Sequence, residues 1–175
     1  MPALHACIDK ILLPYKSLLA NDFDKYRNHV GRVYLHCLLL DSDEANAEKY
    51  AIAAVFHDIG LWTAQTFDYL APSIAVSEDY LHHHNRQEWM DEISQMIYWH
   101  HKMTRYKGPV LTTAETFRKA DWMDVTLGLM AFGISRQTLK QYRDQLPLLG
   151  FHLFLFKRAA KYFLKHPFHP LPMFK

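Results

Sequence analysis

The stretch Ala54-Val55-Phe56-His57-Asp58-Ile59-Gly60 joins an apolar run to an imidazole, a carboxylate and a glycine. Adjacent helical residues lie about 100° apart, so His57 and Asp58 can both lean toward one ion near a helix end. Gly60 is the residue that most readily adopts the left-handed conformation that ends many helices, and the terminal carbonyls of a helix favour a cation. The stretch therefore predicts a helix whose end holds a metal ion.

Composition limits the domain organisation and the class of partner. With 175 residues and 50% hydrophobic content, the chain can bury one sizeable core, so we expect a single domain over residues 1–175. The formal net charge of +2 gives no argument for sequence-specific nucleic-acid binding or for membrane binding. The uncharged run at 146–156 falls short of the roughly 18 residues of a membrane span, and the N-terminus does not resemble a signal peptide. We expect a cytoplasmic protein.

Apolar residues recur at three- and four-residue steps along most of the chain, which is typical of helices, and no useful β-type alternation occurs. Asn21 or Asp22 is the expected N-cap of one helix, and Asp41 with Glu44 forms an expected capping box for the helix that ends at 57–58. The proline-rich tail at 167–172 cannot be helical. We expect an all-α bundle of about seven or eight helices, at about residues 4–19, 22–40, 41–58, 73–84, 89–101, from 112, 135–145 and 147–165.

Four potential ligands lie on three of the expected helices, each near the apolar side of its helix. They are His29, His57, Asp58 and Asp121. Buried charges need a partner or a metal, so this arrangement predicts one shared ion.

Three segments carry these ligands in order: 26–33 (Tyr-Arg-Asn-His-Val-Gly-Arg-Val), 56–60 (Phe-His-Asp-Ile-Gly) and 119–121 (Lys-Ala-Asp). Through them the chain resembles, over roughly residues 29–124, the HD-domain superfamily of metal-dependent phosphohydrolases. The resemblance implies a helical domain in which the four matching residues hold one divalent ion: Mn, Fe, Co, Ni, Zn or Mg. It also implies that the ion lowers the pKa of a water molecule and polarises a phosphoryl oxygen.

Histidines after the His-Asp pair bear on the number of ions. Superfamily members with two metals carry extra histidines before the last aspartate, but residues 72–76 contain none, so we favour one ion over two. His100 and His101 match the later histidine position, and either could bind a second ion or instead contact substrate or transfer a proton. We favour substrate contact or proton transfer, because histidine is the commonest positioned acid or base. The expected catalytic residues are Asp58, His100 and Lys102, with His101 as a substrate contact.

Charged residues nearby are further candidate substrate contacts. Arg32 follows His29 by three residues, and Asp68 lies in segment 61–72, which we expect to cross the mouth of the site. Lys102 and Arg105 follow the two histidines and would neutralise phosphate charge. A basic cluster is equally typical of a solvated helix end, and a lone carboxylate such as Asp68 is more often an ordinary surface group.

The favoured function is hydrolysis of a small phosphorylated molecule, with a nucleotide as the preferred class. A second hypothesis uses the same metal site for hydratase or lyase chemistry on a small uncharged substrate. A third is a non-catalytic regulatory module of the same fold. The aromatic residues within 151–163 indicate core or a dimer surface, which leaves a homodimer open.

Overall fold

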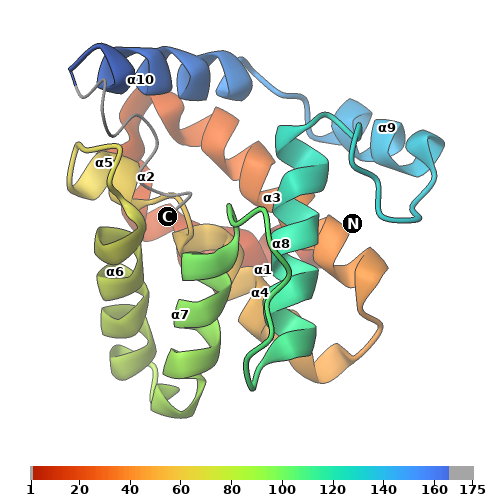
Figure 1. Ribbon diagram of the computed structural model, residues 1–175. Helices are drawn as coiled ribbons and strands as arrows, with labels where there is room; N and C mark the ends of the chain where they lie inside the picture. The colour runs from red at the N-terminus through yellow and green to blue at the C-terminus, as the bar shows by residue number, and fades with distance from the viewer. Residues whose placement is uncertain (1, 166–175) are drawn as a thin grey trace.

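The computed structural model describes residues 2–165, and these form helices and no strand, which confirms the all-α fold class (Figure 1). The expected non-helical tail at 167–172 lies outside the described residues. The α-helices are α1 (Pro2–Leu12), α2 (Lys16–Leu19), α3 (Phe23–Leu40), α4 (Ala47–Phe56), α5 (Gly60–Thr63), α6 (Leu70–His83), α7 (Met90–Trp99), α8 (Leu111–Val125), α9 (Arg136–Gln145) and α10 (Phe151–Lys165).

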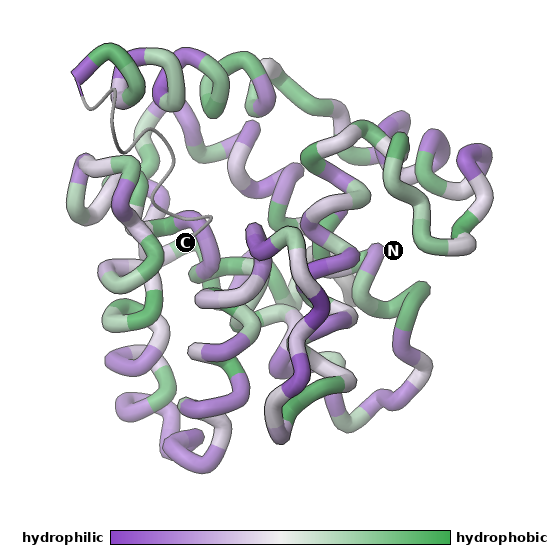
Figure 2. The backbone as a smooth tube through the Cα atoms, viewed as in Figure 1, coloured by the Kyte–Doolittle hydropathy of each residue, from purple (hydrophilic) through white to green (hydrophobic). Residues whose placement is uncertain are grey.

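Hydrophobic and hydrophilic residues are mixed along the outer helices, as expected for helices with one buried side (Figure 2). Green and purple positions alternate along α10, the helix at the top of the view. None of the described helices combines the length and the apolar character that crossing a bilayer requires.

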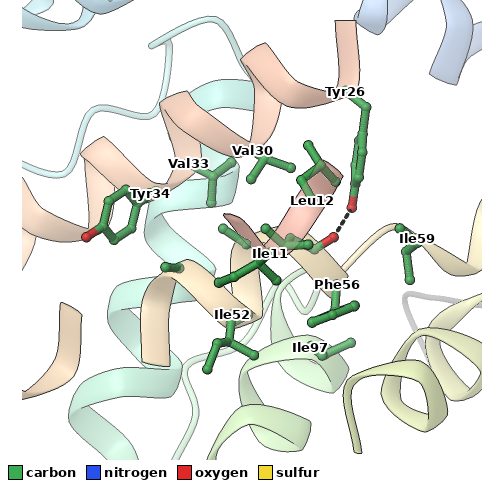
Figure 3. Packing of buried hydrophobic residues seen from close by; sticks show 14 of the residues in the cluster. Ile11, Leu12, Tyr26, Val30, Val33, Tyr34, Ile52, Phe56, Ile59 and Ile97 are labelled. Atoms are coloured by element: carbon green, nitrogen blue, oxygen red, sulfur yellow. Dashed lines mark hydrogen bonds between the residues drawn. The ribbon is translucent and has the colours of Figure 1, made fainter. Parts of the chain in front are cut away.

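Helix α4 lies at the centre of the bundle. Residues 50–56 are all buried, and the helix packs against α1, α3, α6 and α7. Ile52 and Phe56 lie among apolar side chains from the neighbouring helices, and the Tyr26 hydroxyl of α3 donates a hydrogen bond of 2.8 Å to the Val55 carbonyl (Figure 3). The expectation of a central, buried helix is therefore confirmed, although α4 ends at Phe56, with His57 as its C-cap, rather than at residues 57–58.

The helix starts near the N-terminus differ from those expected. A 3-10 turn at Leu13–Tyr15, with Pro14 in its first turn, divides the expected first helix into α1 and α2. Asp22 occupies the cap position of α3, but its carboxylate instead accepts hydrogen bonds from Lys25 and Trp62. The expected capping box is also wrong, because Asp43 rather than Asp41 caps the turn before α4. The Asp41 carboxylate instead accepts from Asn46 and Tyr50, so competing side-chain partners, among which only Trp62 is distant in sequence, change the expected caps.

Gly60 serves a purpose other than the one expected. It begins α5 and has no positive φ, so it does not end a helix in the left-handed conformation. A Cβ atom at this position would lie 2.3 Å from the Tyr69 carbonyl oxygen and 2.8 Å from Ser73 Oγ. The Gly60 amide donates to the same Ser73 hydroxyl at 2.9 Å. Glycine is required here because α6 approaches the backbone directly after His57 and Asp58.

We expect Gly60→Ala to destabilise the protein by about 3 kcal/mol, the upper end for overpacking, because backbone must move to admit the methyl group. Gly31→Ala on α3 is the matched control, since its Cβ would meet only the flexible end of Leu146, at 2.9 Å. Urea unfolding of both variants measures the difference. Equal losses of unfolding free energy in the two variants would contradict the close approach as the reason for Gly60.

Candidate metal centre

Three helices bring the four expected ligands together. Helix α3 supplies His29, the turn between α4 and α5 supplies His57 and Asp58, and α8 supplies Asp121. Helix α3 packs closely along α8 and also against α4 (Figure 1), and this packing brings the three positions close together. All four side chains are buried. The core of the bundle therefore contains a cluster of ionisable groups.

The distances between donor atoms suit one ion. The Nε2 atoms of His29 and His57 lie 3.0 Å apart. Asp58 Oδ2 lies 3.6 Å from His29 Nε2 and 3.3 Å from His57 Nε2. Asp121 Oδ1 lies 3.7 Å from each of these nitrogen atoms. Ligand atoms about 2.1 Å from a common divalent ion are separated by similar distances of about 3.0–3.5 Å.

The other ring nitrogen of each histidine fixes the tautomer. His57 Nδ1 donates to the Ala54 carbonyl at 2.8 Å, and His29 Nδ1 donates to Asp124 Oδ2 at 2.7 Å. A neutral imidazole whose Nδ1 carries the proton presents a lone pair on Nε2. Two such lone pairs 3.0 Å apart repel each other unless a proton or a metal ion lies between them. The arrangement is typical of metal-binding histidines, whose second nitrogen is held by a carboxylate or a carbonyl.

The carboxylates also fit a cation. Within residues 2–165, neither Asp58 Oδ1 nor either oxygen of Asp121 has a hydrogen-bond partner, although all three atoms are buried. Buried polar atoms are normally satisfied, and an unpaired buried carboxylate is especially costly. His29, His57 and Asp58 offer ligand atoms that all lie within 4.8 Å of one another. These residues can therefore hold a divalent metal ion of the nitrogen- and oxygen-binding type.

Burial and the close spacing of these charged groups shift their pKa values. Burial lowers the pKa of His57, but Asp58 and Asp121 outweigh burial and raise that pKa to about 9. Burial lowers the pKa of His29 to about 4, although Asp124 opposes this shift, and burial raises the pKa of Asp121 well above its usual value. The metal-free cluster thus retains protons at neutral pH, and an ion that binds His57 Nε2 must displace one.

The family model for the HD domain matches residues 26–126. The chain belongs to the HD-domain family. No curated protein and no solved structure matches the chain significantly. The HD-domain superfamily comprises metal-dependent phosphohydrolases, and the matched region contains all four candidate ligands.

His100 and His101 of the HD domain lie beside the same cluster. His100 Nδ1 contacts the Ile97 carbonyl at 2.6 Å, and its Nε2 lies 3.6 Å from Asp58 Oδ1. His101 Nδ1 lies 3.5 Å from Asp121 Oδ2, while the Tyr69 hydroxyl lies 2.5 Å from His101 Nε2. Asp58, His100 and His101 form a second group that could hold an ion. Both histidines therefore border the candidate ligands, as their positions in the sequence predicted.

Asp124 is a site residue that sequence analysis missed. It accepts from His29 Nδ1 and also from Arg32, whose Nε and Nη2 lie 2.5 and 2.9 Å from its two oxygens. Burial raises the pKa of Asp124, but His29 and Arg32 outweigh burial and hold it well below the usual value. The available signal was spacing, since Asp124 follows Asp121 by three residues on one side of α8.

Arg32 therefore differs from the expected substrate contact. The side chain is fully buried, and its guanidinium group is occupied by Asp124 and by the Leu146 carbonyl at 2.7 Å. A substrate would have to displace both partners to bind it. We assign Arg32 a positioning role, in which it holds the carboxylate that orients His29.

The remaining expected site residues are Lys102, Arg105 and Asp68. Lys102 is buried, and its ammonium lies 4.5 Å from the ring centroid of the exposed Tyr98. Arg105 and Asp68 are exposed. Among the described residues, none of these three side chains forms an ion pair with Asp58 or Asp121. The roles expected for Lys102, Arg105 and Asp68 therefore stay predictions.

A buried carboxylate holds the segment after the two histidines. Glu115 of α8 accepts from the Tyr106 amide at 2.6 Å and from Arg118 at 2.9 Å. Arg118 in turn donates to the Lys102 carbonyl at 3.4 Å. Burial raises the pKa of Glu115, but Arg118 outweighs burial and lowers it from the usual 4.5. Glu115 thereby anchors residues 102–106 beside the candidate site.

We expect Glu115→Gln to lower the unfolding free energy at pH 7 by about 1–3 kcal/mol, because the Arg118 charge loses its buried partner. A depressed pKa in the folded state contributes stability above pH 4.5 that is lost as pH falls through the folded pKa. The difference in unfolding free energy between wild type and Glu115→Gln should therefore decrease as the pH falls. Urea unfolding at pH 7, 5 and 3.5 measures it, with the exposed Glu88→Gln as control. A gap that stays constant with pH would contradict this role.

Proposed function

We propose that this HD domain is a metal-dependent phosphohydrolase that cleaves a phosphate ester or anhydride of a small molecule, with nucleotides as the preferred class. The observation that carries the proposal is the convergence of two Nε2 lone pairs and two buried carboxylates, with unpaired oxygens, in a chain of this family. His29, His57, Asp58 and Asp121 would hold one divalent ion. When bound, such an ion acidifies water and polarises a phosphoryl oxygen.

The proposed proton carrier is His100. Its Nδ1 proton is engaged by the Ile97 carbonyl, which leaves Nε2 as an acceptor directed at the side of Asp58. Burial lowers the pKa of His100 despite the opposing effect of Asp58, so the imidazole is neutral and able to take a proton near pH 7. His101 and Tyr69 share a hydrogen bond beside it and are the proposed substrate contacts.

Phosphate recognition is assigned to Lys102 and Arg105. Lys102 lies two residues after His100, and its flexible four-carbon side chain would need to leave the ring of Tyr98 to reach a phosphate. The observed position of this ammonium also favours a second candidate, hydratase or lyase chemistry on an uncharged substrate. The rings of Phe117 and Phe151, which contact His57 and His29, supply apolar surroundings of the kind that such a substrate needs.

The test is release of inorganic phosphate from nucleoside mono-, di- and triphosphates and from simple phosphomonoesters. Protein stripped with chelator is reloaded with Mn, Co, Ni, Zn or Mg. We expect phosphate release that depends on metal and that weakens in Lys102→Met, with Lys107→Met, which removes the same charge from an exposed position, as the control. Stoichiometric metal without phosphate release from any substrate would favour the hydratase or lyase candidate. Protein that binds no metal would instead favour a non-catalytic module.

A further inference from the structure

A cavity lies between α10 and the segment around α5. Its volume is about 980 Å³, which is within the range typical of small-molecule sites. We call it the α10 pocket, and its walls include Trp62, Phe67, Phe154 and the basic face of α10. None of the four candidate metal ligands lines it. Helix α10 lies outside the region that the HD-domain model matches.

The α10 pocket is strongly cationic. Its lining contains five basic residues and, among the described residues, no carboxylate: Lys25, Lys157, Arg158, Lys161 and Lys165. Two of these charges are already engaged, because Lys25 pairs with Asp22 at 2.7 Å and Arg158 donates to the Leu61 carbonyl at 2.9 Å. The other three are exposed and form no ion pair within residues 2–165. At helical steps of four residues they make a row with spacings of about 6 Å, which suits a ligand with several negative charges.

The α10 pocket also has an apolar wall, formed by aromatic rings and leucines. Trp62 and Phe154 stack with ring centroids 5.3 Å apart and planes 7° apart. Leu18, Leu149 and Leu153 line the pocket and remain exposed. Exposed apolar side chains that surround a cavity commonly mark a binding surface. A ligand that carried charge alone would leave this wall uncovered.

We propose that the α10 pocket binds a small molecule in which two or more phosphate groups are joined to an apolar or aromatic body. Lys157, Lys161 and Lys165 contact the phosphates, and the rings and leucines contact the body. The site requires no hydrolysis and no metal, so it stands or falls independently of the proposed phosphohydrolase.

The test is isothermal titration calorimetry at fixed ionic strength, with chelator present so that the metal centre does not contribute. The probes are ATP, geranyl diphosphate and inorganic tripolyphosphate. We expect saturable binding of ATP or geranyl diphosphate that is tighter than binding of tripolyphosphate. Lys157→Ser/Lys161→Ser should weaken it by about tenfold, whereas Lys10→Ser/Lys140→Ser, with the same change in net charge, should alter it by less than about twofold.

The two body-bearing probes identify the ligand class, since ATP tests an aromatic body and geranyl diphosphate an aliphatic one. Equal affinities for all three probes would overturn the role of the apolar wall. If the two double variants lost equal amounts of affinity, net charge alone would explain the attraction, and the proposed site would be wrong. An absence of saturable binding of both ATP and geranyl diphosphate would overturn the site as well.

Discussion

Replacing Asp58 with asparagine is expected to abolish stoichiometric metal binding and to lower metal-dependent phosphate release by about 10³-fold or more. Asp58 belongs to both groups of potential ligands. Its Oδ2 lies 3.3 Å from His57 Nε2, and its Oδ1 lies 3.6 Å from His100 Nε2. Removing a residue that only orients a ligand commonly costs about 10–100-fold, so loss of a charged ligand should cost more. The amide keeps the size of the side chain, so we expect the helical fold to persist.

Metal analysis, phosphate release and thermal unfolding with and without metal measure this effect together. Metal should raise the melting temperature of the wild type, since it binds only the folded state, but not that of Asp58→Asn. Asp79→Asn, on the exposed side of α6, is the matched control and should behave as wild type. A variant at position 58 that retained full metal content and rate would rule out Asp58 as a ligand.

The second large effect that we expect is a loss of stability when Arg32 is replaced. Arg32→Met should lower the unfolding free energy by about 3–5 kcal/mol, because it leaves the Asp124 carboxylate buried without its cationic partner. The methionine fills similar space but cannot donate to Asp124 or to the Leu146 carbonyl, both of which Arg32 contacts. Urea unfolding of metal-free protein measures the loss.

Arg27→Met is the matched control on the same helix. Arg27 pairs with Asp9 where both side chains are 27% exposed, so its loss should cost less than about 1 kcal/mol. A direct substrate contact at Arg32 would instead raise KM without a comparable loss of stability. That outcome would contradict the positioning role.

The helices and the four candidate ligands could be predicted because each depends on local pattern. Apolar spacing predicts α3, α4 and α8, and the expected start of α9 at Ser135 agrees with the capping hydrogen bond that the Ser135 hydroxyl accepts from the Thr138 amide. His57 and Asp58, at the end of a buried helix, need further ligands to complete a metal site. Only a few acidic residues and histidines lie on the apolar sides of the expected helices. The metal-binding roles themselves remain predictions until an ion is measured.

The remaining features depend on contacts between distant parts of the chain. Arg32 and Asp124 are separated by 92 positions, and nothing near Arg32 in the sequence reveals that its charge is already paired. Gly60 was assigned to a left-handed turn because that is the commonest reason for a glycine after a helix, whereas the actual reason is the Tyr69 carbonyl. The position of the Lys102 ammonium over Tyr98 depends on a rotamer that sequence does not specify.

Helix α10 has a consequence for how such a domain can change during evolution. Phe151, at its first position, stacks on His29 with ring centroids 4.2 Å apart and packs against Phe154 of the α10 pocket. The helix thus covers a ligand from outside residues 26–126. Substitutions in α10 can therefore change the surroundings of His29 while all four candidate ligands stay in place. The surroundings of this candidate ligand are thus set partly by a helix that the HD-domain model does not cover.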